Sequence, residues 1–155
     1  MMGGLAWLEQ TSVSAFVRED LYAYFVLLIV HAWGMALLVG GGLAVGLRLL
    51  GVASGARLER FAGFFPYMRV GAVLAVLSGL GLLAGYPAKA LTNWLFPLKF
   101  VLLIGAAMAL RRGWIGAISS GQGRPWAALS IALWLGGVTA GKLLLYTYSM
   151  LMTTD

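Results

Sequence analysis

Residues 21–50 read LYAYFVLLIVHAWGMALLVGGGLAVGLRLL. This stretch has no charged side chain between Asp20 and Arg48, and an apolar run of that length can cross a bilayer as one helix. It also contains His31, the only histidine of the chain. Because an ionisable side chain inside a membrane span is costly, such a residue usually has a partner or a function. The stretch therefore predicts a transmembrane helix that carries a polar site.

The composition of the whole chain indicates the same environment. Of 155 residues, 61% are hydrophobic and 10% are charged, whereas a soluble domain has roughly 25% charged residues. The absence of cysteine excludes disulfides, thiolate metal sites, iron–sulfur ligation and covalent c-type haem attachment. The net charge of +6 resides mainly in segments between apolar stretches, which indicates membrane topology and argues against nucleic-acid binding.

Four apolar stretches are predicted to cross the membrane. Pro66 and Pro97 fall in the first turns of the second and third, where proline is tolerated because the first N–H groups of a helix have no intrahelical partner. Thr92 and Asn93 are suited to cap the third. We expect one all-α integral membrane domain, a four-helix bundle. The predicted spans are residues 21–47, 64–85, 94–110 and 126–150.

A short interfacial helix is predicted ahead of the first span. The residues up to Val17 combine an apolar group around Trp7 with polar residues, a pattern typical of a helix that lies on the membrane surface. Small residues at four-residue spacing, such as Gly42 and Gly46, recur inside the spans. This spacing lets helices approach closely in lipid, where packing replaces the hydrophobic effect.

Basic residues are concentrated in the first and third predicted loops, of which the third covers residues 113–125. The N-terminus, the second loop and the tail have only Arg18 and Lys89 as basic side chains. Because positively charged loops stay in the cytoplasm, both termini are predicted to lie on the periplasmic side of a bacterial cytoplasmic membrane. The residues of the two basic loops and their edges are Arg48, Arg57, Arg60, Arg111, Arg112 and Arg124.

Three ionisable side chains fall inside the spans at similar depth. At 1.5 Å per residue, His31 lies ~15 Å from the outer end of its span, Lys99 ~8 Å and Lys142 ~12 Å. No carboxylate lies in any span to neutralise them. A positively lined site in the outer half of the bilayer would accommodate a haem propionate, a lipid phosphate or a quinone carbonyl.

Each of these residues also has a structural interpretation. Lys99 and Lys142 are close enough to the interface to extend their ammonium groups to it. His31 is too deep and too short for that, but it could hydrogen-bond to a backbone carbonyl or to Thr139 as a contact within the bundle. Met35 lies one turn from His31 on the same face. It either fills the core or, as a soft ligand, forms a copper site with His31.

Segments of three spans resemble a bacterial family of four-span membrane proteins of unassigned activity. They are HAWGMALLVGGGLAVGLRLLG in span one, WLFPLKFVLL in span three and WLGGVTAGKLLLY in span four. That family is similar in outline to the copper-resistance D domain and, more distantly, to the HemJ-type membrane protoporphyrinogen oxidase. The oxidase relatives bind b-type haem and use a histidine in span one and a lysine in span three. The resemblance therefore implies a haem-related role for His31 and Lys99. This chain departs from the close family at Gly46, where an acidic residue is frequent, and at Lys142, where arginine is frequent.

The sequence leaves three functions open. The leading one is a redox protein that binds haem b or a quinone, with His31 as axial ligand, Lys99 and Lys142 facing propionates or carbonyls, and Met150 as a candidate second ligand. A protein that handles copper or a small solute would use His31 and Met35. A non-catalytic subunit of a membrane complex, or a homo-oligomer, would pack through its glycine faces. An enzyme acting alone has the least support, because no paired carboxylates, nucleophile–base pair or nucleotide-binding motif is present.

Overall fold

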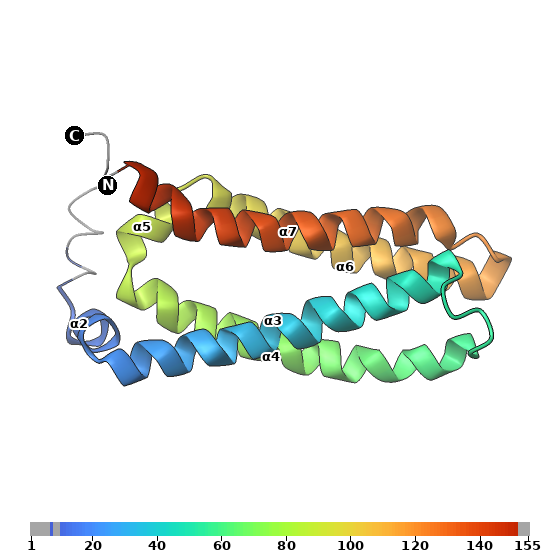
Figure 1. The fold of residues 1–155 in the computed structure, drawn as a ribbon, viewed down its shortest axis with the longest axis horizontal. Coiled ribbons are helices and arrows are strands. Elements are labelled where there is room, and N and C mark those ends of the chain that lie inside the picture. The colour runs from blue at the N-terminus through green and yellow to red at the C-terminus, as the bar shows by residue number, and fades with distance from the viewer. Residues whose placement is uncertain (1–6, 8–9, 152–155) are drawn as a thin grey trace.

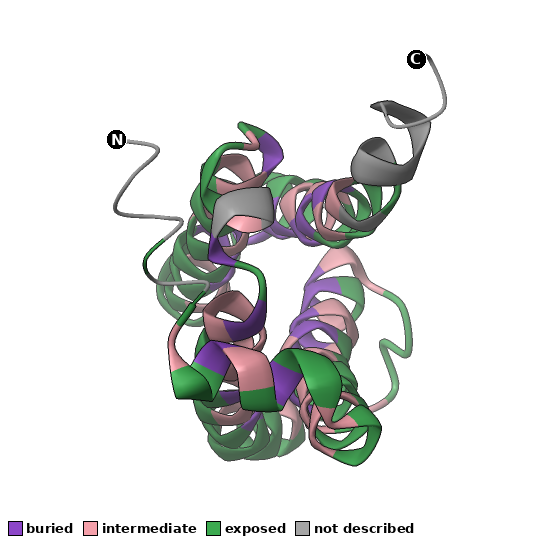
Figure 2. Cartoon of the chain, turned by 90° about the vertical axis from the view of Figure 1, so that its left-hand side faces the viewer, coloured by how far each residue is buried: buried purple, intermediate pink, exposed green. Residues whose placement is uncertain are grey.

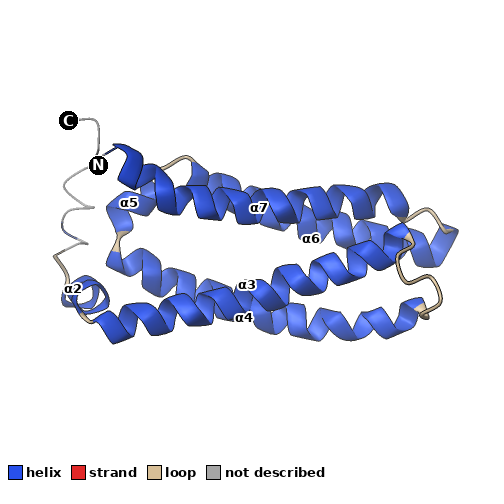
Figure 3. Cartoon of the chain, in the orientation of Figure 1, coloured by secondary structure: helices blue, strands red, loops and turns tan. Residues whose placement is uncertain are grey.

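Two helical hairpins form the body of the computed structural model, which describes residues 7 and 10–151 (Figure 1). The described residues form helices and loops without a strand (Figure 3). Four of the helices contain apolar segments long enough to cross a membrane. The prediction of an all-α four-helix bundle is therefore confirmed. These helices are α3 (Leu21–Leu50), α4 (Phe64–Gly85), α6 (Leu95–Ser120) and α7 (Arg124–Leu151).

Three short helices lie at the ends of the bundle. Helix α2 (Ser12–Glu19) precedes α3, η1 (Leu58–Gly63) leads into α4, and α5 (Pro87–Leu91) follows it. Figure 2 shows α2 lying across the end of the α3–α4 hairpin. The predicted N-terminal helix is confirmed for residues 12–17, and it continues for two more residues to Glu19. The part of that prediction on residues 1–6, 8 and 9 lies outside the described residues.

Helix α2 is fastened to the end of α4. The buried Ser14 hydroxyl donates a hydrogen bond to the carbonyl of Gly85 over 3.3 Å, and the side chain of Val17 is also buried. A methyl group on Gly85 would come within 2.8 Å of Val17 Cγ1, so glycine is needed for this close contact. One face of α2 is therefore packed on the bundle, while Phe16 on the other side of it remains exposed.

Both ends of α3 are defined by recognisable signals. The carboxylate of Asp20 accepts hydrogen bonds from the backbone N–H groups of Tyr22 (2.9 Å) and Ala23 (3.0 Å), which otherwise have no helical partner. At the other end Gly51 adopts a left-handed conformation with φ of 106°, and its N–H donates to the carbonyl of Arg48. Glycine adopts this conformation without steric cost, so the chain turns sharply there.

The first hairpin is held by direct backbone contact between α3 and α4. A methyl group added at Gly34 would lie 2.5 Å from the backbone nitrogen of Ala75, and one added at Gly71 would lie 2.6 Å from that of Leu38. Such distances are possible only because both residues lack a side chain. These two glycines, which the four-residue spacing in the sequence did not single out, let the two helices touch along their backbones, as expected for packing in lipid.

The two hairpins meet along α3 and α7. Trp134 of α7 is fully buried, and its indole lies against Gly42 of α3. Val45, Leu49 and Leu110 belong to the same core cluster. Figure 1 shows the hairpins in contact toward the C-terminal end of α3 and diverging toward the end that carries α2 and α5. We call these the arginine end and the α2 end of the bundle.

The prediction of a loop over residues 113–125 is wrong for most of that segment. We expected the helix to end at Arg112, but α6 continues to Ser120 and only residues 121–123 connect it to α7. Gly113 packs closely against the start of α7, since a methyl group there would lie 3.2 Å from the carbonyl oxygen of Gly123. The hydroxyls of Ser119 and Ser120 donate to carbonyls four residues earlier. Packing against α7 therefore keeps this glycine- and serine-rich segment helical.

Candidate functional site

His31 lies on α3 about three turns from the α2 end, on the side that faces α4. Its Nδ1 is 3.0 Å from the carbonyl oxygen of Ala75 and 3.1 Å from the Ser78 hydroxyl oxygen. A methyl group on Gly79 would lie 3.3 Å from His31 Cε1, so this glycine leaves the space that the imidazole fills. The alternative that His31 bonds to a neighbouring backbone carbonyl is thus confirmed. The alternative partner Thr139 is wrong, because its hydroxyl donates to Leu135 of its own helix.

The two acceptors determine which imidazole nitrogen carries the proton. The Ala75 carbonyl can only accept a hydrogen bond. The Ser78 hydroxyl has a single proton, which it donates to the carbonyl of Leu74 over 2.5 Å. The hydrogen at Nδ1 is therefore assigned from this network, with Nδ1–H donating to Ala75 and Ser78. In the neutral imidazole, Nε2 then carries the lone pair.

Nε2 of His31 is open for a ligand. No hydrogen bond joins it to any described residue, and His31 is only half-buried. Within the described part of the chain, Trp134 Nε1 is the one fully buried side-chain nitrogen or oxygen without a hydrogen-bond partner. Nε2 is therefore not sealed in the protein. Hydrogen bonds at Nδ1 therefore hold the imidazole in place, while Nε2 remains accessible.

Lys99 comes toward His31 from the other hairpin. It lies in the first turns of α6, and its charge acts at Coulombic range on the His31 imidazole. Its ammonium nitrogen is 5.2 Å from the ring centre of Phe96 and 5.0 Å from that of Phe100, a cation–π arrangement. Lys99 forms no ion pair with a described carboxylate. The fold therefore places two of the residues that the sequence singled out within electrostatic range of each other, one from each hairpin.

The other candidate residues are placed differently. Lys142 is exposed on α7. Met35 is partly buried and packs against the core cluster. The side chain of Met150 lies outside the described residues. No group of three or more His, Cys, Asp or Glu side chains among the described residues is arranged to hold a metal ion.

Three residues of this region were not identified from the sequence. Ser78 is the only serine or threonine between residues 64 and 85, which was a usable signal for a polar contact in span two. Phe96 and Phe100 pack edge to face, with ring centres 5.1 Å apart, around the Lys99 ammonium. Aromatic residues are common near span ends, so nothing in their spacing marks them as partners of a lysine.

Comparison with protein-family models, with curated proteins and with solved structures finds no match to this chain. The chemistry of the site therefore has to be argued from its own groups. These are an oriented imidazole whose neutral form carries a lone pair on Nε2, a cation supported by two aromatic rings, and apolar helix surfaces around both. Such a set can coordinate a metal centre that is already held by another ligand, and it favours a group with negative charge.

Proposed function

We propose that this protein binds haem b at the α2 end of the bundle, with His31 Nε2 as axial ligand, and serves electron transfer or haem handling in a bacterial cytoplasmic membrane. The observation that carries the proposal is the anchored imidazole. Its Nδ1–H donates to the Ala75 carbonyl over 3.0 Å, and its Nε2 has no described hydrogen-bond partner. A histidine that ligates a metal almost always donates its other ring N–H in this way.

The charge next to His31 supports haem over a simple copper ion. A ferrous haem b carries two propionates and a net negative charge, whereas Cu⁺ and Cu²⁺ are cations. Lys99 attracts the former and repels the latter, and the effect is larger in a low-dielectric surrounding than in water. Met35, the soft ligand that a copper site would need, packs against the core instead. Lys99 is therefore the proposed partner of a propionate.

A quinol is the second candidate, favoured by one feature of the site. With Nδ1 protonated, Nε2 accepts a hydrogen bond from a quinol hydroxyl but cannot donate one to a quinone carbonyl. The Lys99 ammonium can donate to that carbonyl, and the rings of Phe96 and Phe100 offer surfaces for the quinone ring. This candidate needs no second metal ligand.

The chain offers one histidine, so the proposed haem is five-coordinate unless Met150 or a second copy of the chain supplies the sixth ligand. The resemblance to the HemJ-type oxidase supports the same pair, His31 and Lys99. We propose further that both termini are periplasmic, on the basis of the arginine-rich inner loops. A role as a subunit of a larger membrane complex is compatible with haem binding.

The proposal is tested by absorption spectroscopy of the protein purified in mild detergent from cells with ample haem supply. We expect a Soret band that shifts on dithionite reduction, disappears in His31→Ala and persists in Met35→Leu, the matched control one turn away on the same face. Added imidazole should restore the band in His31→Gly. Sharp reduced α and β bands would show that a second axial ligand is present.

A featureless spectrum from the folded, haem-supplied protein would contradict haem binding. In that case, organic extraction and chromatography of the same preparation test the quinol alternative. A quinone that co-purifies with the wild type and is lost in both His31→Ala and Lys99→Gln would support that alternative. If neither haem nor a quinone is bound, His31 and Lys99 have only a structural role between the two hairpins.

A further inference from the structure

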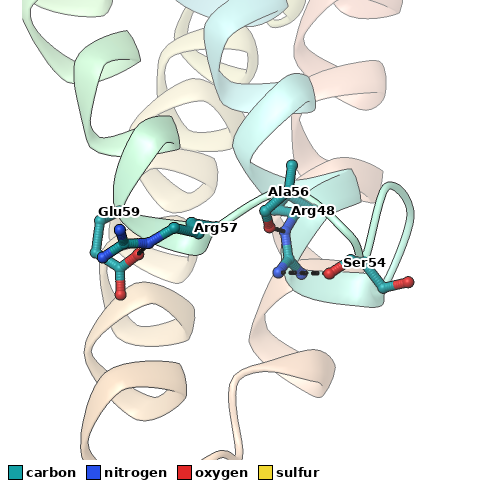
Figure 4. A network of polar contacts seen from close by, with 5 residues as sticks. All are labelled: Arg48, Ser54, Ala56, Arg57 and Glu59. Atoms are coloured by element: carbon teal, nitrogen blue, oxygen red, sulfur yellow. Dashed lines mark hydrogen bonds and ion pairs between the residues drawn. The ribbon is translucent and has the colours of Figure 1, made fainter.

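The arginine end of the bundle has almost no negative charge. Glu59 is the only acidic residue between residues 21 and 154. It pairs with the neighbouring Arg57, whose Nε is 3.5 Å from the carboxylate, and both side chains are exposed (Figure 4). The remaining arginines at this end therefore cannot be neutralised by the described protein. Their side chains differ in how they are held.

Arg48 stabilises the loop that follows α3. Its Nε donates to the carbonyl of Ala56 over 2.9 Å, and an Nη donates to the carbonyl of Ser54 over 3.4 Å (Figure 4). Both acceptors are backbone groups of the connection between α3 and η1. Much of the hydrogen-bonding capacity of Arg48 is thus used within the protein, and we assign it a structural role.

Arg112 and Arg124 are held in position without such partners. The guanidinium of Arg112 lies 4.9 Å from the ring centre of Trp126, at the start of α7. Arg124 reaches across to the end of α3, where its Nη2 would be 3.4 Å from a methyl group on Gly51. Both side chains are exposed, and neither forms a hydrogen bond or ion pair with a described residue. Their N–H donors are therefore available to a ligand.

Apolar surface lies beside Arg112 and Trp126. Met108 is one turn from Arg112 toward the middle of α6, and Leu129 is one turn from Trp126 toward the middle of α7. Both side chains are exposed, at 56% and 44%. A ligand held by the guanidinium groups would thus have hydrocarbon surface next to its charged part, on the side where the helices enter the bilayer. That combination matches an amphipathic anion better than a free ion.

We propose that Arg112, beside Trp126, and Arg124, beside the end of α3, bind the phosphate of an anionic phospholipid at the junction of the two hairpins. Guanidinium groups match phosphate oxygens in charge and geometry, and basic sites between helices at the cytoplasmic surface bind anionic head groups. Because Arg124 also contacts the end of α3, the bound head group connects α3 to the α6–α7 hairpin. This site is independent of any cofactor at His31.

The test compares two double variants with equal loss of charge. R112Q/R124Q removes the proposed ligands, whereas R57Q/R60Q removes two exposed arginines from the same end and serves as the matched control. Each protein is delipidated in detergent, and its melting temperature is measured with added phosphatidylglycerol or with phosphatidylcholine of the same acyl chains. Native mass spectrometry of the same samples counts the lipids that remain bound.

We expect phosphatidylglycerol, but not phosphatidylcholine, to raise the melting temperature of the wild type and of R57Q/R60Q. The rise and the retained lipid should be lost in R112Q/R124Q. Equal effects of the two lipids, equal losses in the two double variants, or the same rise with inorganic phosphate alone would each overturn the proposal. Should R112Q/R124Q fail to fold, R112Q and R124Q singly must each weaken lipid retention several-fold relative to R57Q, or the proposal is wrong.

Discussion

The two ends of α3 differ in how the rest of the chain packs on them. Every buried residue of α3 lies between Gly34 and Leu49, where α4 covers one side and α7 the other. None of the residues from Leu21 to His31 is buried. The packed part has glycines where a neighbouring backbone or indole must come close, and the open part holds the one histidine. We infer that stability comes mainly from the arginine end, and ligand chemistry from the α2 end.

The largest effect is expected where two backbones touch. In Gly34→Ala the new methyl group would lie 2.5 Å from Ala75 N and 2.8 Å from Gly71 O. Backbone atoms cannot rotate away, so α4 has to move, and we expect a loss of about 3 kcal/mol or more in unfolding free energy. An SDS titration in mixed micelles, followed by circular dichroism, measures it.

Gly40→Ala is the matched control for that substitution. It lies on the same helix, and no atom of a neighbouring element is within 4 Å of the added methyl group. We expect no loss, and up to ~1 kcal/mol of gain, because alanine costs less backbone entropy in a helix than glycine does. Equal losses in Gly34→Ala and Gly40→Ala would show that helix contact does not limit stability.

Alanine substitutions at a second pair of glycines, Gly42 and Gly79, compare how tightly the two ends of the bundle are packed. In Gly42→Ala the methyl group would lie 2.5 Å from Nε1 of the fully buried Trp134, and we expect a loss of about 2 kcal/mol. In Gly79→Ala the nearest atom is Cε1 of the half-buried His31, at 3.3 Å, so the expected loss is below ~1 kcal/mol. The same titration measures both variants. A loss in Gly79→Ala as large as that in Gly42→Ala would mean that the α2 end is equally tightly packed.

Two buried serines separate stability from ligand binding. Ser130 of α7 donates to the carbonyl of Ala106 of α6 over 2.9 Å, while Ser78 accepts from His31 and donates to its own helix. Hydrogen bonds between membrane helices contribute about 0.6 kcal/mol each. We therefore expect each serine-to-alanine change to lower the free energy of unfolding by about that amount. Haem titration should show affinity about 10-fold lower in Ser78→Ala and unchanged in Ser130→Ala. Equal affinities in the two variants would contradict the orienting role of Ser78.

The smallest effects on stability are expected for the two lysines inside the spans. Lys99→Gln and Lys142→Gln should each change unfolding free energy by less than ~0.5 kcal/mol. Because a nearby positive charge favours the reduced haem, Lys99→Gln should lower the midpoint potential by about 20–60 mV, or ~0.5–1.4 kcal/mol for one electron. Because the side chain of Lys142 is exposed, Lys142→Gln should leave the potential unchanged. Spectroelectrochemistry measures both, and equal shifts would contradict the pairing of His31 with Lys99.

The sequence by itself determined the four apolar helices and several of their ends. Hydropathy and capping are local properties, so a one-dimensional pattern contains them. Asp20 caps α3 through two backbone N–H groups, and the side chain of Asn93 accepts from the N–H of Leu95 over 3.0 Å, as its position before span three predicts. Residue counting also predicts a similar depth for His31 and Lys99 within their spans.

Only the tertiary structure decided which side chains meet. In lipid, every apolar helix face is equally well solvated, so hydropathy does not say which helix packs on which. That His31 bonds to Ala75 of α4, that Lys99 lies within electrostatic range of it, and that α6 stays helical beyond Arg112 all depend on contacts between distant segments. Shape complementarity between glycines and their neighbours fixes those contacts, and it exists only once the helices are packed together.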